Sequence, residues 1–143
     1  SFQFGNEDNV VIKNEHNVCL YQHVFDALSA YLMIAVKQRE GKRFQDNYEV
    51  VQDVSQKVKT FEFAKMLEKE VGFTLSEIDN THRGESEYNT LDNTLIRSIG
   101  WKPVFKDNEA VAKSVSNWYN NYIEGSNMKN TTLAQIEDAF NKL

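Results

Sequence analysis

The 143-residue sequence has little of several things that mark common functional classes. It holds one cysteine, so no disulfide can form within the chain, which fits a reducing compartment. Its 16 Lys and Arg residues are outnumbered by 21 Asp and Glu, and no basic run of the kind that follows a phosphate backbone occurs. No stretch reaches the ~18 apolar residues of a membrane helix, and no signal-peptide pattern is present. We therefore expect a cytoplasmic protein with no nucleic-acid and no membrane partner.

Phosphate-binding glycine loops are also missing from the sequence. Among its six glycines there is no G-x-G-x-x-G and no Walker A pattern, and no Tyr is followed four residues later by Lys. We expect no cofactor-binding residue in this chain. Because the sequence begins "SFQFGNEDN", with neither Met nor a helix cap before the first apolar run, we expect it to be part of a longer protein.

Apolar residues make up 41% of the chain, which is enough to fill the core of a single domain over residues 1–143. Periodicity and turn residues predict an α+β fold in which several helices surround short strands. The expected strands cover residues 9–13, 47–52, 73–79 and 88–92, and the expected helices cover 24–40, 58–71, 93–99, 108–124 and 133–143.

Buried helix faces and helix caps follow from the same pattern. Ser55, Asp92 and Asp107 are expected as N-caps, Gly72 as a C-terminal cap, and Thr132 with Gln135 as a capping box for the last helix. Two apolar stripes with a spacing near 3.6 are expected to face the core. They are Val24, Leu28, Tyr31, Leu32, Ala35 and Val36 in the first helix, and Val111, Val115, Trp118 and Tyr122 in the fourth.

Two of the three histidines flank the cysteine in "HNVCLYQHV". His16, Cys19 and His23 could supply three zinc ligands, with His82 as a fourth, but structural zinc sites usually take close ligand pairs from two turns. Cys19 and His23 would pair as nucleophile and base if they shared a helix, yet nothing nearby marks an oxyanion hole or an orienting group. We therefore expect no metal site and no catalytic residue in this chain.

An acidic stretch, "IDNTHRGESEY", contains Asp79, Glu85 and Glu87. Paired carboxylates in a cleft can act as acid and base. A solvated turn has the same composition, and the sequence alone leaves both interpretations open.

The order of several segments resembles the CDP-glucose 4,6-dehydratases of the extended short-chain dehydrogenase/reductase family. "LYQHVFDALSAYL" is similar to that family's R-P-W-Q-H-V segment followed by a helix with L-S-G-Y-L. "GESEYNTLDNTLIRSIGWKPVF" is similar to its H-E-A-x-Y-L-x-L-D and L-G-W-x-P segments, and "VSNWYNNYIEG" with "TTLAQI" resembles its tail. L-G-W-x-P is common to many sugar-nucleotide enzymes, whereas the Q-H-V, L-S-x-Y-L and T-L-A-Q-I segments together indicate the CDP-glucose branch.

The resemblance covers nearly the whole chain and implies that it is the C-terminal, substrate-binding lobe of such an enzyme. It implies a nucleotide-sugar substrate, an N-terminal Rossmann domain that binds NAD, and a homodimer formed through that absent half. The chain alone is then expected to be inactive. Four residues, Tyr21, Gln22, His23 and Glu85, are expected nearest the substrate crevice.

Several positions depart from the family pattern. Cys19 and Leu20 stand where the family has Arg and Pro, and a thiol cannot make the bidentate phosphate contact of a guanidinium. Glu49 replaces an Asn, Gly84 a His and Leu95 a Lys. A degenerate, non-catalytic binding or assembly module is therefore an alternative hypothesis, and the lobe of a sugar-nucleotide epimerase is another.

Overall fold

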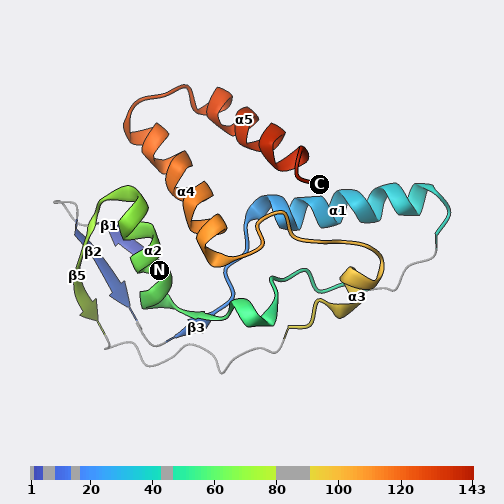
Figure 1. Cartoon of the computed structure of the whole chain (residues 1–143), viewed down its shortest axis with the longest axis horizontal. Coiled ribbons are helices and arrows are strands. Elements are labelled where there is room, and N and C mark those ends of the chain that lie inside the picture. The colour runs from blue at the N-terminus through green and yellow to red at the C-terminus, as the bar shows by residue number, and fades with distance from the viewer. Residues whose placement is uncertain (1, 5–8, 14–16, 43–46, 80–90) are drawn as a thin grey trace.

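The computed structural model describes residues 2–4, 9–13, 17–42, 47–79 and 91–143. The predicted α+β class is confirmed, since the chain contains both helices and short strands (Figure 1). The strands are β1 (Phe2–Phe4), β2 (Asn9–Lys13), β3 (Val18–Cys19), β4 (Val58–Lys59) and β5 (Thr74–Asp79). The helices are α1 (Val24–Arg39), α2 (Thr60–Val71), α3 (Thr94–Ser98), α4 (Asn108–Ile123) and α5 (Met128–Phe140), with a 3-10 turn at Val54–Gln56.

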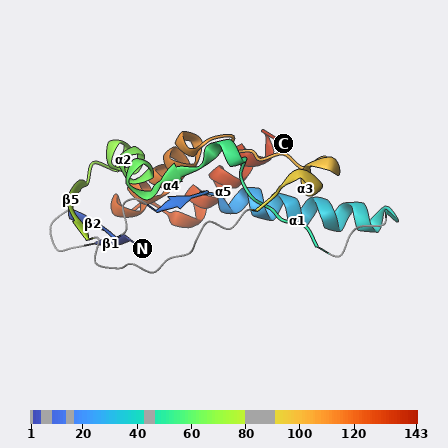
Figure 2. The same ribbon diagram turned by 90° about the horizontal axis from the view of Figure 1, so that it is seen from below.

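The larger sheet has the strand order β1-β2-β5 and lies at one end of an elongated molecule (Figures 1 and 2). β1 runs antiparallel to β2, whereas β2 and β5 are parallel, with Lys13 paired to Asp79. The two parallel strands therefore end at the same edge of the sheet. A second, two-stranded ladder joins β3 to β4 and pairs Cys19 with Val58.

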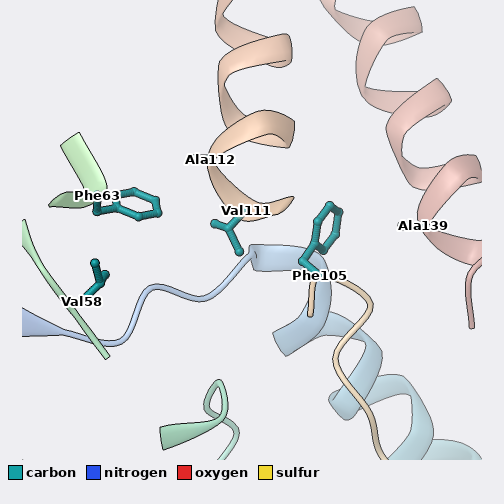
Figure 3. Packing of buried hydrophobic residues seen from close by; sticks show 6 residues of the cluster. All are labelled: Val58, Phe63, Phe105, Val111, Ala112 and Ala139. Carbon is teal, nitrogen blue, oxygen red and sulfur yellow. The ribbon is translucent and has the colours of Figure 1, made fainter. Parts of the chain in front are cut away.

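Two clusters of buried apolar residues are found in the part of the chain that the structure describes. The first lies where α2, α4, α5 and the start of α1 meet (Figure 3), and the second lies between α1 and α3. The first contains Val58, Phe63, Phe105, Val111, Ala112 and Ala139. The second contains Ala30, Ile96 and Trp101, with Met33 and Ile34 of α1 packed against it.

The predicted buried face of α1 is wrong. Leu28, Tyr31, Leu32 and Val36 are 48 to 64% exposed, and Ala35 is exposed as well. The helix instead packs through the opposite face, which carries Ala30. Periodicity identified an apolar stripe correctly but could not tell which side meets the core, because α1 is apolar on both sides.

The stripe on α4 is only partly buried. Val111 is buried, as predicted, but Val115, Trp118 and Tyr122 are exposed. Only the first turns of α4 reach the core, where α2 and α5 lie on either side of it (Figure 1).

The strand predicted at 47–52 is wrong. Val51 and Gln52 are both buried, so the segment lacks the alternation of a half-buried strand. Side chains take the place of a strand partner: Asn93 Nδ2 donates to Val51 O at 3.0 Å, and Gln52 Nε2 donates to Phe105 O. Most of the strand predicted at 88–92 lies outside the described residues, and Leu91 and Asp92 are in no strand.

Predicted caps have mixed outcomes. Asp107 caps α4 by accepting a hydrogen bond from Ala110 N at 2.8 Å, and Gly72 ends α2 with φ +84°, both as predicted. Ser55 does not cap α2, because it lies in the separate 3-10 turn, where its N–H donates to Asp53 Oδ1. The N-cap of α3 is Asn93 and not the predicted Asp92, although Asp92 Oδ1 accepts from Thr94 N at 2.8 Å.

The last helix begins four residues before the predicted capping box. Asn127 is its N-cap and accepts from Asn130 N at 3.2 Å. Thr132 and Gln135 instead bond to α4: Trp118 Nε1 donates to Thr132 Oγ1, and Gln135 Nε2 donates to Ser114 O.

The helices of the described part of the chain are all too short or too polar to span a bilayer.

Candidate functional site

The predicted substrate residues Tyr21, Gln22 and His23 lie in the short connection between β3 and α1. The chain just before β3 is fixed to the start of α2, because Thr60 N donates to Asn17 O at 2.9 Å and the Thr60 hydroxyl donates to the same oxygen. The β3-β4 ladder fixes Val18 and Cys19 next to the same segment. The connection is therefore an anchored part of the fold.

Tyr21 packs into the first core cluster. Its ring stacks on Phe63 with 3.8 Å between ring centroids and 8° between ring planes. Its hydroxyl donates to Thr60 Oγ1 at 3.4 Å. Burial raises the pKa of the Tyr21 phenol, so this group is a neutral hydrogen-bonding hydroxyl at physiological pH.

His23 is buried and has a structural role as the N-cap of α1. Nδ1 accepts a hydrogen bond from Phe25 N at 3.2 Å, and the ring stacks on Phe105 at 3.9 Å between centroids. Burial lowers the pKa of His23 to about 4 because the imidazolium would lose its hydration. The imidazole is thus neutral at pH 7 and acts as an acceptor through Nδ1.

Gln22 differs from its two neighbours. Its Nε2 atom is buried yet has no hydrogen-bond partner within the described residues. A buried amide without a partner costs free energy, so it identifies a place where a ligand or another segment can supply an acceptor. Among the predicted substrate residues that the structure describes, Gln22 is the one with a buried side-chain nitrogen that lacks a partner.

The fourth predicted substrate residue, Glu85, lies outside the described residues, as do Glu87, His16 and His82. Tyr21, Gln22 and His23 are thus brought together by sequence adjacency alone. Asp79 ends β5 beside Lys13 at the end of β2.

Cys19 and His23 do not share a helix. Cys19 is in β3, where its Sγ accepts from Asn17 Nδ2 at 3.5 Å, and His23 precedes the first turn of α1. The condition for a nucleophile and base pair is therefore not met. No three His, Cys, Asp or Glu side chains gather as a metal site in the segments that the structure describes.

Two segments that resemble the dehydratase family, residues 28–32 (L-S-x-Y-L) and residues 100–103 (G-W-x-P), contact each other directly. Trp101 is 2% exposed, and its Nε1 donates to Ser29 Oγ at 3.0 Å and to Asp26 O at 3.2 Å. Ser29 in turn donates to Asp26 O at 2.8 Å. Two motifs about seventy residues apart in the sequence are thus one packing unit that holds α1 against the segment after α3.

Asp26 is a buried polar centre that sequence reasoning did not single out. Its Oδ1 accepts from Val104 N at 2.6 Å and from Phe105 N at 3.4 Å, while Oδ2 has no partner among the described residues. Burial raises the pKa of its carboxyl, partly offset by those two backbone hydrogen bonds. An acidic residue on the packed face of an otherwise apolar helix was the available signal.

Glu49 is used by the fold. Its Oε2 accepts from Asp92 N at 2.6 Å, and Asp92 Oδ1 accepts from the hydroxyl and the N–H of Thr94. The two hydrogen bonds from Thr94 lower the pKa of the Asp92 carboxyl. Glu49 therefore fixes the chain just before α3.

The chain is similar in sequence to a known enzyme. No family model matches the chain. The chain is 26% identical over 141 residues to a CDP-glucose 4,6-dehydratase of Salmonella typhimurium (strain LT2). The alignment covers 94% of this chain and 38% of that enzyme, so the chain spans about two fifths of the relative's length. This similarity is consistent with a fragment of that family and indicates an origin related to sugar-nucleotide dehydratases.

Proposed function

We propose that this chain is the C-terminal, sugar-nucleotide-binding lobe of a longer NAD-dependent 4,6-dehydratase. The observation that carries the proposal is the similarity to a CDP-glucose 4,6-dehydratase over 94% of the chain. Enzymes of this class oxidise C4 of the hexose, eliminate water across C5 and C6, and return the hydride to C6. The proposed part of this lobe is to hold the nucleotide sugar in position, which can lower a barrier by several kcal/mol.

The described residues do not fit NAD. A dinucleotide-phosphate loop places glycines between a strand and the N-terminus of a helix. The four described glycines, at positions 41, 72, 100 and 125, all follow helix C-termini and have positive φ. Cofactor binding and hydride transfer are therefore proposed for a Rossmann domain of the longer protein.

Within the lobe, Gln22 is the proposed substrate contact. Its buried Nε2 has two N–H donors and no partner in the described part of the chain, and an oxygen of a bound nucleotide sugar would supply the missing acceptor. Tyr21 and His23 fix the connection on either side through their stacking on Phe63 and Phe105. Glu85 is proposed as a further contact from the segment that follows β5.

The test is an assay of the longer natural protein with CDP-glucose and NAD for the 4-keto-6-deoxy sugar. We expect turnover, and expect Gln22→Ala and Gln22→Met both to weaken substrate binding about tenfold, because each removes the amide donors. Gln22→Met keeps the side-chain volume, so a loss with Gln22→Ala alone would indicate a packing role. Absence of turnover with every nucleotide hexose would remove the enzyme proposal.

A second candidate function, a binding or assembly module without catalysis, is favoured by two positions. Cys19 offers no cation for a diphosphate, and Glu49 adds a carboxylate to the segment where the family has an Asn. Calorimetry of the longer protein with cytidine diphosphate sugars separates the two functions. Saturable binding supports the dehydratase lobe, and its absence with all nucleoside diphosphate sugars supports the assembly module.

A further inference from the structure

Phe105 lies between α3 and α4, outside the helices and strands that the structure describes. A residue in such a segment finds no backbone partner in a helix or a strand ladder. Both of its backbone groups are nonetheless bonded to side chains from distant segments. Asp26 Oδ1 of α1 accepts from Phe105 N at 3.4 Å, and Gln52 Nε2 donates to Phe105 O. Two separate parts of the chain therefore hold Phe105 in place.

The two side chains that hold Phe105 are costly to bury. Asp26 and Gln52 are both 0% exposed, and Asp26 Oδ2 has no partner among the described residues. A buried carboxylate with one unpaired oxygen is an expensive way to satisfy backbone N–H groups, since its charge loses hydration. Proteins keep local arrangements that reduce stability where the position of a residue matters for function.

The ring of Phe105 supports His23. The two rings stack with 3.9 Å between their centroids and 18° between their planes, beside the start of α1 (Figure 3). His23 Nδ1 also accepts from Phe25 N at 3.2 Å. The stack fixes the plane of the imidazole, and the hydrogen bond fixes its rotation within that plane. Phe105 is only 6% exposed, so its ring has little room to move away from His23.

Gln22 directly precedes His23, and its buried Nε2 has no partner within the described residues. The direction in which this amide can offer its N–H donors depends on the backbone on either side of it, and His23 fixes one side. We infer that Phe105 is a positioning residue for substrate binding, which acts through His23 on the amide of Gln22. The inference rests on the proposed function, in which Gln22 contacts the nucleotide sugar.

The test is a double-mutant cycle between Phe105 and Gln22 in the longer natural protein, assayed with CDP-glucose and NAD. Phe105→Leu keeps an apolar side chain but removes the flat ring, so KM for CDP-glucose should rise about fivefold while kcat stays within about twofold of wild type. In the Gln22→Met background the same change should alter KM by less than about twofold, because the amide that Phe105 positions is already absent. Phe105→Met also lacks a ring, is closer to Phe in volume, and should give the same pattern if Phe105→Leu does not fold.

Ile96→Val is the matched control, because it shortens a fully buried apolar side chain in the second core cluster. It should leave KM unchanged in both backgrounds. A role of Phe105 in folding alone would lower the active fraction, and with it kcat, without changing KM. The inference is overturned if Phe105→Leu and Phe105→Met leave KM unchanged, or raise it equally with and without the Gln22 amide. A wild-type protein that turns over no nucleotide hexose overturns the proposed function and this inference together.

Discussion

His23 and Asp26 are buried three residues apart, and burial moves their pKa values in opposite directions. Burial disfavours the charged form of each, so the pKa of His23 falls to about 4 and the pKa of Asp26 rises. At neutral pH the imidazole of His23 is therefore neutral, whereas burial disfavours the charged form of Asp26. The two residues give opposite contributions to the pH dependence of stability.

His23 is expected to make the protein less stable in acid. Its folded pKa lies below the unfolded value of 6.5, so its contribution is fully present above pH 6.5 and is lost as the pH falls toward 4. That loss amounts to about 3 kcal/mol of unfolding free energy. His23→Asn keeps an oxygen that can cap α1 but does not titrate. Urea unfolding at several pH values should show a shallower decline for the variant.

At pH 7 the His23→Asn variant should itself be less stable by about 1 kcal/mol, because the stack on Phe105 is lost. Carboxylates that titrate below pH 5 affect both proteins equally and cancel in the difference. An identical pH profile for wild type and variant would show that His23 is not buried as described.

Asp26→Asn is expected to have the opposite pH signature. Because the folded pKa of Asp26 is raised, its favourable contribution is present below pH 3.8 and is lost as the pH rises through the folded value. Asn keeps an acceptor for Val104 N and carries no charge. The stability of the variant relative to wild type should therefore increase from about pH 4 to pH 7 in urea unfolding. Asp26→Ala is the control, since it leaves Val104 N and Phe105 N unpaired and should destabilise at both pH values.

At the scale of elements, the start of α5 offers a direct comparison between sequence and structure. Asn127 caps the helix, whereas the sequence favoured Thr132. Asn127→Ala should cost about 1 kcal/mol of unfolding free energy, because Asn130 N loses its acceptor. Asn127→Asp preserves the acceptor and should stay close to wild type. Thermal unfolding followed by circular dichroism measures both.

Thr132→Val serves as the counterpart. In the structure it removes only the acceptor of Trp118 Nε1, which is near the surface, so its cost should be below that of Asn127→Ala. A larger cost for Thr132→Val than for Asn127→Ala would place the helix start where the sequence put it.

Elements with strong local signals could be predicted from the sequence. β2, β5, α1 and α4 lie where the residue pattern placed them, because a β-branched run or a capped helical period is a local property. The strand expected at 47–52 could not be corrected from the sequence, since its polar groups are satisfied by Asn93 and Phe105, far along the chain. The conformation of residues 47–52 therefore depends on tertiary contacts.

The candidate site was predictable to a smaller extent. The resemblance placed Tyr21, Gln22 and His23 together, and the structure gives them one anchored connection. Tyr21 stacks on Phe63 and His23 stacks on Phe105, whereas the Gln22 amide nitrogen has no described partner. These contacts join residues far apart in the sequence, so no local pattern could predict them.

At the scale of the whole molecule, α1 is apolar on two opposite sides. One side packs on the cluster of Ala30, Ile96 and Trp101, and the other exposes Tyr31, Leu32 and Val36. A helix that is apolar all round is normally buried on all sides. The chain spans 38% of the relative it matches, so a further part of the longer protein is the proposed cover for the exposed side.

The double variant Leu32→Gln with Val36→Gln tests this arrangement by comparing two lengths of protein. In the 143-residue chain alone, both side chains are more than half exposed, so its unfolding free energy should change by no more than about 0.5 kcal/mol. In the longer protein the same changes would bury two amides in an apolar contact and should destabilise it by about 3 kcal/mol, measured by urea unfolding. Met33→Gln, on the packed side of α1, should destabilise both lengths and is the control for a working measurement. If the double variant is neutral in both lengths, the exposed side of α1 does not dock a second domain, because buried leucine and valine side chains cannot be exchanged for glutamine without a cost.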